Sequence, residues 1–412
     1  MTPLTTPTPS AKKRILFVDD ELPILDLFSM MFRKDVTDWD IALSRSGAEA
    51  LALMEQQAFE VVVSDMRMPG MNGAQFLSEV MQRYPKTARL ILSGYAEQEA
   101  VAKCVGAAHQ FLMKPCDLAT LQTTLKRVCA LDVFLRNDIL KTLVAKMAVV
   151  PSVPSVYYRV LKELQSPAAS AESIGEIVAL DPGITAKLLQ LVNSAFFGFS
   201  RKVCNPSEAV QLLGIATVRS LAVSIHAFSC FEQSKVPFFS IGQMWNHSLH
   251  TGLYAQKIAQ SARMGQPTTD EAFIAGLLHD LGKLMMCANM PEPYQQAQAL
   301  AREKQITIGA AEQEIFGATH ADVGAYLLGL WGLPVPIVEA VALHHQPLKA
   351  ISRSFTPLTA VHIANVLDHE NSDEHDGTIA SGLDQEFLKQ VGVQDQVDGW
   401  RTLVAPLGKA AA

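Results

Sequence analysis

The chain has 412 residues with a formal net charge of −7 and a pI of about 5.9; 49% of the residues are hydrophobic and 18% are charged. This composition excludes a largely disordered chain, and the length predicts two or three domains. DNA binding has no electrostatic support because no basic cluster occurs, and no apolar run is long enough to span a membrane. Six cysteines without paired spacing are typical of a reducing cytoplasm. We therefore expect a cytoplasmic protein that binds neither DNA nor a membrane.

The first 13 residues lack the apolar stretch of a signal peptide, and we expect them to be a disordered lead. From residue 14 to about 130, apolar runs typical of buried strands alternate with runs of helical period. This alternation predicts a five-stranded parallel sheet with helices on both faces, a doubly wound α/β domain. The clearest apolar runs cover residues 15–18, 61–63 and 90–92, and the helical runs cover residues 24–32, 47–56, 74–83 and 118–128.

Charged and small side chains stand at the ends of the predicted strands. Asp19 and Asp20 follow the first strand, Asp65 ends VVVSD, and Ser93 and Lys114 end later strands. Because the carboxyl ends of parallel strands open on one crevice, we expect three carboxylates and a lysine to lie together. Crowded carboxylates are pushed toward protonation unless a cation neutralises them, and an all-oxygen site suits magnesium. One carboxylate is then available to attack a phosphorus atom.

These residues, their order and the Lys-Pro pair after the fifth strand resemble the receiver domain of two-component response regulators, which has a flavodoxin-like fold. The resemblance implies that a sensor histidine kinase phosphorylates Asp65. It also implies roles for the neighbouring residues: Mg²⁺ binding by Asp19, Asp20 and Asp65, and phosphoryl sensing by Ser93, Phe111 and Lys114. For Phe111, plain core packing is an equal alternative to a rotamer switch.

A helical connector is predicted over residues 131–150, because neither Pro nor Gly interrupts residues 116–150 and leucines recur at helical spacing. One continuous helix and two helices with a short join are both compatible with this pattern. Pro151 and Pro154 then open a second domain. Helical patterns continue to about residue 367, so residues 151–368 are predicted to be an all-helical domain, with a polar loop and a last helical segment over residues 369–412.

Six residues of this helical domain are of metal-binding types and occur in a suggestive order. The adjacent pair His279-Asp280 lies in an apolar run that is predicted to be helical, and such a pair must be neutralised or ligated if it faces a core. Imidazole and carboxylate together suit iron, manganese or zinc, and a bound metal activates water for phosphoester hydrolysis. Imidazoles without a metal remain an open alternative. The six residues are His247, His279, Asp280, His320, His344 and His345.

This arrangement resembles the HD superfamily of metal-dependent phosphohydrolases, with two departures. Asn365 stands where the last acidic ligand is expected, with Asp368 one helical turn further on, and no GYP element follows the double histidine. A closer resemblance covers residues 146–367, through VVPSVPSV, LDPGITAKLLQLVNSAFFG, GLLHDLGK and THADVGAYLLGLWGLP. These segments resemble the HDOD domain, an HD-related output domain regarded as non-hydrolytic that acts in signalling and partner binding.

The sequence therefore predicts a response regulator whose HDOD domain acts on an unidentified downstream protein without hydrolytic activity. The alternative is a receiver-controlled, metal-dependent phosphohydrolase, which His247, His279 and Asp280 keep open. A homodimer is compatible with either. Since the connector over residues 131–150 is the covalent link between the domains, we expect phosphorylation to act through it.

Overall fold

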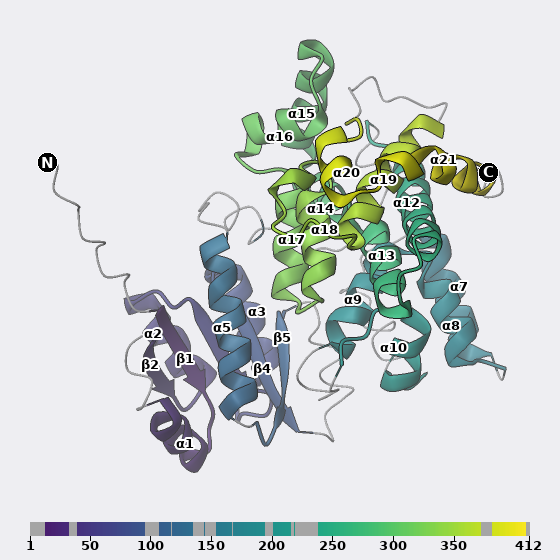
Figure 1. Cartoon of the computed structure of the whole chain (residues 1–412). Coiled ribbons are helices and arrows are strands. Elements are labelled where there is room, and N and C mark those ends of the chain that lie inside the picture. The colour runs from purple at the N-terminus through teal and green to yellow at the C-terminus, as the bar shows by residue number, and fades with distance from the viewer. Residues whose placement is uncertain are drawn as a thin grey trace, which may run out of the picture.

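A computed structural model describes residues 13–32, 39–94, 107–116, 118–134, 144, 154–166, 168–193, 201–215, 218, 238–371 and 381–408. Figure 1 shows an α/β unit formed by the first part of the chain and a larger all-helical body formed by the rest. Within the described ranges, no helix has the length and apolar character needed to cross a membrane. Most of the predicted lead and nearly all of the predicted connector lie outside the described residues.

The α/β unit contains the predicted five-stranded parallel sheet, with strand order β2-β1-β3-β4-β5. The three apolar runs identified in the sequence form the centres of β1, β3 and β4, and each of their residues is at most 1% exposed. Such burial on both faces is the reason for their unbroken apolar character. The strands are β1 (Lys13–Val18), β2 (Trp39–Ser44), β3 (Val61–Asp65), β4 (Ala88–Gly94) and β5 (Gln110–Lys114).

Helices cover both faces of this sheet. The helix predicted over residues 47–56 has those bounds in the structure, because the Ser46 side chain accepts a hydrogen bond from the Glu49 amide and fixes the helix start. The last described helix of the unit extends six residues beyond its predicted end at residue 128. The helices are α1 (Leu22–Phe32), α2 (Gly47–Gln56), α3 (Gly73–Arg83) and α5 (Leu118–Phe134).

The second part of the chain is helical throughout its described residues, as predicted. Ser170 and Asp181 cap the starts of two of its helices, and Pro182 occupies the first turn after Asp181. The first seven helices are α7 (Pro154–Gln165), α8 (Ala171–Val178), α9 (Pro182–Val192), α10 (Pro206–Leu213), α12 (Ile241–Ser261), α13 (Gln266–Leu278) and α14 (Leu281–Asn289). The others are α15 (Pro291–Lys304), α16 (Ile308–Phe316), α17 (His320–Leu330), α18 (Val335–Leu343), α19 (Pro357–Asn371), α20 (Gln385–Val391) and α21 (Val397–Gly408).

One local prediction was wrong: His279-Asp280 does not lie inside a helix but at the junction between α13 and α14. The backbone leaves helical geometry at Asp280, with φ −100° and ψ 10°. This break lets α14 pack closely on α17, since a Cβ atom on Gly282 would lie 1.9 Å from the carbonyl oxygen of His320. Only glycine permits such an approach, and it brings Asp280 beside His320.

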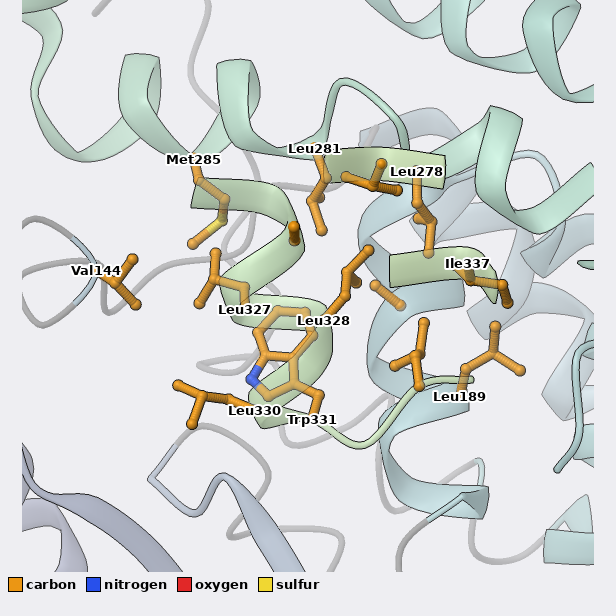
Figure 2. Packing of buried hydrophobic residues seen from close by; sticks show 14 of the residues in the cluster. Val144, Leu189, Leu278, Leu281, Met285, Leu327, Leu328, Leu330, Trp331 and Ile337 are labelled. Atoms are coloured by element: carbon orange, nitrogen blue, oxygen red, sulfur yellow. The ribbon is translucent and has the colours of Figure 1, made fainter. Parts of the chain in front are cut away.

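The centre of the helical domain is the buried helix α17. Figure 2 shows Leu327, Leu328 and Trp331 packed among side chains of neighbouring helices, including Leu189 of α9 and Ile337 of α18. All five are at most 4% exposed. Dense packing of this kind leaves little room for independent movement of the helix.

The C-terminal segment packs onto the same domain. Helix α21 contacts α12 and α19, and Trp400 within it is 2% exposed. The backbone amide of Asp384, which caps α20, donates to His362 Nε2 of α19 at 2.9 Å. Residues 381–408 are therefore part of the helical body rather than a separate tail.

Candidate phosphoacceptor and metal sites

A crevice at the carboxyl ends of the strands brings together Asp19, Asp65 and Lys114. The Lys114 ammonium lies 2.6 Å from Asp19 Oδ2 and 2.5 Å from Asp65 Oδ1. The remaining carboxylate oxygens accept backbone hydrogen bonds, Asp19 Oδ1 from Glu21 at 3.0 Å and Asp65 Oδ2 from Arg67 at 2.7 Å. Two buried carboxylates thus share one cation.

The electrostatics of this crevice depend on that cation. Burial raises the pKa of Asp65, against the opposing effect of the Lys114 ammonium. Burial also works to lower the pKa of Lys114, but its hydrogen bonds to Asp19 and Asp65 outweigh burial and leave that pKa raised. The lysine therefore stays charged at neutral pH, ready to pair with additional negative charge.

The other predicted residues of the crevice are placed by the same strands. Asp20 directly follows Asp19 and is partly exposed. Ser93 follows Leu92, the β4 partner of Asp65 in the sheet register, and is fully buried. Phe111 is also fully buried, in β5 beside Ile91, so it packs in the core in this state.

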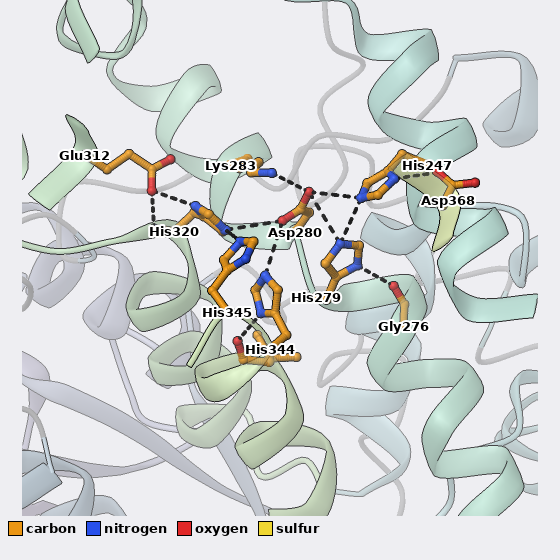
Figure 3. A network of polar contacts seen from close by, with 11 residues as sticks. His247, Gly276, His279, Asp280, Lys283, Glu312, His320, His344, His345 and Asp368 are labelled. Carbon is orange, nitrogen blue, oxygen red and sulfur yellow. Dashed lines mark hydrogen bonds and ion pairs between the residues drawn. The ribbon is translucent and has the colours of Figure 1, made fainter. Parts of the chain in front are cut away.

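A second cluster of ionisable groups lies in the helical domain around Asp280 (Figure 3). On one side, His247 Nε2 and His279 Nε2 are 3.1 Å apart and lie 3.7 and 3.5 Å from Asp280 Oδ2. The ligand atoms of these three residues are all within 4.8 Å of one another. The structure therefore brings together the three residues that the sequence marked as the start of a metal site.

The opposite oxygen of the same carboxylate faces a second histidine group. Asp280 Oδ1 lies 3.4 Å from His320 Nε2 and 3.8 Å from His344 Nε2. His345 Nε2 lies 3.1 Å from His320 Nε2, and these four residues form another set with all ligand atoms within 4.8 Å. Asp280 thus belongs to both groups, one through each oxygen.

Four of these histidines are held by their Nδ1 atoms, at 2.6 to 2.8 Å from an oxygen. Since carboxylate and carbonyl oxygens only accept hydrogen bonds, each Nδ1 must carry a proton, which leaves the Nε2 atom of a neutral ring available to bind a metal. This is the arrangement of histidines that ligate a metal. The acceptors are Asp368 for His247, the Gly276 carbonyl for His279, Glu312 for His320 and the Val341 carbonyl for His344.

The charge state of the cluster also fits a divalent metal. Burial lowers the pKa of His279 to about 4 and that of His344 well below its usual value, so both rings are neutral at neutral pH. Although burial alone would raise the pKa of Asp280, His279 and Lys283 hold it well below its usual value. Within the described part of the chain, Asp280 Oδ1 and His344 Nε2 are buried without a hydrogen-bond partner. A metal ion would satisfy both atoms.

Asp368 and Asn365 are the two residues near the position expected for a last acidic metal ligand. Asp368 does not face Asp280; it accepts hydrogen bonds from His247 Nδ1 at 2.6 Å and His250 Nδ1 at 3.1 Å. Burial alone would raise the pKa of Asp368, but these two bonds lower it to about 2. Asn365 is 2% exposed, and no partner of its Oδ1 atom occurs among the described residues. Asp368 therefore orients the His247 ring from outside the cluster.

Sequence reasoning missed two further residues of the site. Lys283 Nζ donates to Asp280 Oδ2 at 2.7 Å, and its i,i+3 spacing from Asp280 could have indicated this. Glu312 is fully buried and receives hydrogen bonds from both the backbone and the ring of His320, at 2.8 and 2.6 Å. No local pattern marks Glu312, because its role depends on the packing of α16 on α17.

Comparison with known families identifies two domains in the chain. The response regulator receiver domain model matches residues 15–126, and the HDOD domain model matches residues 150–347. The chain therefore contains a response regulator receiver domain followed by an HDOD domain. A receiver domain implies a histidine kinase as a general signalling partner.

Particular relatives match either domain. An uncharacterized protein of Treponema pallidum is 28% identical over 218 residues, which are 53% of this chain and 42% of the relative. The transcriptional regulatory protein ZraR of Escherichia coli K12 is 33% identical over 117 residues, 28% of this chain and 26% of ZraR. The chain thus spans less than half the length of these curated relatives.

Two solved structures resemble larger parts of the chain. The MmoQ response regulator of Methylococcus capsulatus is 24% identical, with a TM-score of 0.49, over 61% of this chain and 97% of that one. An HDOD domain protein of unknown function from Geobacter sulfurreducens is 21% identical, with a TM-score of 0.38, over 66% of this chain and 98% of that one.

Proposed function

We propose that this protein is a response regulator that a sensor histidine kinase phosphorylates on Asp65. The observation that carries the proposal is the shared contact of Asp65 and Asp19 with Lys114 at the ends of parallel strands. In the transfer, an Asp65 carboxylate oxygen forms a new P–O bond while the P–N bond to the kinase histidine breaks. Such transfer requires positioning and charge neutralisation above all.

The crevice also supports a magnesium site. Asp19, Asp20 and Asp65 supply only oxygen atoms, which Mg²⁺ prefers. Bound Mg²⁺ would neutralise charge on the phosphoryl oxygens. Lys114 would then pair with a phosphoryl oxygen, and Ser93 would donate its hydroxyl proton to another. A rotamer change of Phe111 upon phosphorylation remains a prediction.

The test is modification by acetyl phosphate and Mg²⁺, measured by intact mass. We expect one phosphoryl group per chain in the wild type and none in Asp65→Asn. The control variant Asp40→Asn changes an exposed aspartate of β2 and should be modified like the wild type. Undiminished modification of Asp65→Asn would contradict the assignment.

For the output domain, we propose partner binding by an HDOD domain that holds a metal centre at Asp280. The donor set of neutral imidazoles around one carboxylate suits iron, manganese or zinc. Elemental analysis after growth in metal-supplemented medium tests the centre. The downstream partner can be sought by pull-down with and without a phosphoryl mimic at Asp65, which should change the captured protein.

Phosphoester hydrolysis is a second candidate activity. It is favoured by the position of Asp280 between two histidine groups, because a bound metal pair could polarise a phosphoryl group and activate water. Lys283, 2.7 Å from Asp280, could pair with a phosphate oxygen. We nevertheless expect no turnover of cyclic-di-GMP, since Asn365 replaces the expected acidic ligand and the GYP element is missing. A metal-dependent activity that is lost in His279→Ala would establish the hydrolytic function instead.

A further inference from the structure

The two domains contact each other at the amino end of β5. Gln110, the first residue of β5, is fully buried, and its side-chain amide donates to the carbonyl oxygen of Leu330 at the end of α17. From the other side, Gln190 of α9 donates through Nε2 to the carbonyl oxygens of Ala108 and His109, both at 3.2 Å. Side-chain amides from both domains thus fix β5 against α9 and α17.

The same interface encloses two cationic side chains. Lys187 of α9 is 4% exposed, and its ammonium lies 4.1 Å from the centre of the Trp331 ring. Arg89 of β4 is 6% exposed and donates through Nε to the carbonyl oxygen of Ala107 at 2.6 Å. Burying like charges near one another costs free energy. This cost opposes the closed interface, which the Gln110 and Gln190 contacts stabilise.

Helix α17 joins this interface to the metal cluster. Leu330 at its end accepts the Gln110 amide, while His320 at its start presents Nε2 to Asp280. A straight helix of 11 residues spans about 16 Å. The close packing of Gly282 on the His320 carbonyl leaves no slack between α17 and α14. His320 and Asp280 therefore belong to one tightly packed unit with α17, so a displacement at the Leu330 end of α17 is transmitted to the metal cluster.

Strand β5 joins the same interface to the phosphoacceptor. Lys114 at its carboxyl end contacts Asp65, and Gln110 at its amino end contacts α17. These two positions are about 13 Å apart in an extended strand. A phosphoryl group on Asp65 offers Lys114 new acceptor oxygens, so the contacts at the carboxyl end of β5 must rearrange.

We propose that phosphorylation of Asp65 alters the metal affinity of the Asp280 centre through β5, the Gln110–Leu330 contact and α17. This proposal rests on the phosphoacceptor and the metal centre proposed above. It provides a noncovalent route between the domains that does not require the connector at residues 131–150. By thermodynamic linkage, metal binding must change the affinity of the receiver for a phosphoryl mimic by the same factor.

The experiment measures the Mn²⁺ dissociation constant of the full chain by equilibrium dialysis and elemental analysis, in Mg²⁺ with and without beryllium fluoride. Beryllium fluoride acts as the phosphoryl mimic on Asp65. We expect the dissociation constant of the wild type to change by a factor within the usual range for allosteric coupling, about 5- to 150-fold. In Asp65→Asn, beryllium fluoride should have no effect.

The Gln110→Ala variant should still bind Mn²⁺ and should still bind beryllium fluoride. The effect of beryllium fluoride on the Mn²⁺ dissociation constant should fall to less than about twofold, below the usual range for allosteric coupling. The matched control is Gln56→Ala, which changes an exposed glutamine of α2 and should keep the full coupling. If circular dichroism shows that Gln110→Ala is unfolded, Gln190→Ala tests the same interface from the HDOD side, because it removes the hydrogen bonds to the Ala108 and His109 carbonyl oxygens just before β5.

The possible failures can be told apart. Equal Mn²⁺ affinity with and without beryllium fluoride in the wild type overturns the coupling while the metal centre stands. Full coupling in a folded Gln110→Ala or Gln190→Ala variant overturns the proposed route. Absence of specific Mn²⁺ binding in both states overturns the metal centre and, with it, the coupling.

Discussion

The receiver crevice and the Asp280 cluster both contain buried carboxylates and a lysine. The negative charge of the carboxylates is balanced differently in the two sites. In the crevice, Lys114 lies between the carboxylates of Asp19 and Asp65 and contacts both. In the cluster, Lys283 contacts Oδ2 of Asp280, whereas Oδ1 of the same carboxylate faces histidine nitrogens. Lys114 can thus shift its contacts from the carboxylates to a phosphoryl group. Oδ1 of Asp280 and the histidine nitrogens around it can instead receive a metal ion. The predictions below test this difference.

The largest effect is expected for Asp280→Asn. The change replaces the carboxylate that faces both histidine groups. The affinity for metal should therefore fall by more than about 100-fold, which exceeds the usual loss when a residue that only orients a metal ligand is replaced. Isothermal titration with Mn²⁺ measures this. Asp395→Asn, an exposed aspartate, is the control and should bind as the wild type does. Unchanged affinity in Asp280→Asn would show that the cluster is structural.

A smaller loss is expected for Glu312→Gln. Glutamine can still accept a hydrogen bond from His320 Nδ1 but without negative charge, so the ring becomes a weaker ligand. Loss of such outer partners typically costs about 10- to 100-fold in metal affinity. Metal titration checks the loss, and thermal unfolding in the absence of metal checks that the fold is retained. A change in unfolding temperature without a change in affinity would contradict the positioning role.

A still smaller, pH-dependent effect is expected at the domain interface. Burial, reinforced by Arg89, lowers the pKa of Lys187 to about 7 from its usual 10.5. Between pH 7 and 10.5, Lys187 binds more protons when the interface is open and the side chain is exposed than when the interface is closed. The closed interface therefore gains stability as the pH rises through this window, by at most about 1.4 kcal/mol per pH unit. His109 stays neutral there, because burial, Arg89 and Lys187 hold its pKa well below 6.5.

Hydrogen exchange of residues 107–116 and 182–192 between pH 7 and 10, corrected for intrinsic exchange rates, measures this stability. Protection should rise with pH in the wild type and stay flat in Lys187→Met, which keeps a chain of similar length over Trp331. An equal rise in both proteins would show that Lys187 is charged in the closed state.

Local signals made most of the fold predictable from the sequence. The unbroken apolar runs identified three central strands, and apolar residues at helical spacing identified the helix over residues 47–56. The order of the histidines and the resemblance to HD phosphohydrolases marked the candidate metal ligands that the structure brings together around Asp280. The break of the helix at Asp280 was not predictable, because it depends on the contact of Gly282 with His320, 38 residues further along the chain.

The supporting contacts were equally beyond sequence reasoning. Asp368 lies 121 residues from His247 in sequence, and Gln110 lies 220 residues from Leu330. Such pairings follow from tertiary packing and leave no periodic trace in the chain. The prediction that the connector transmits the signal concerns residues that are nearly all outside the described ranges, and it remains a prediction.

The most direct test of the account is the metal stoichiometry of the purified protein after growth with added manganese and iron, followed by anomalous diffraction to locate the ions. We predict two metal ions that share the Asp280 carboxylate. One should lie beside His247 and His279, and the other beside His320, His344 and His345. Metal-free protein with Asp280 still paired to Lys283 under these conditions would contradict it.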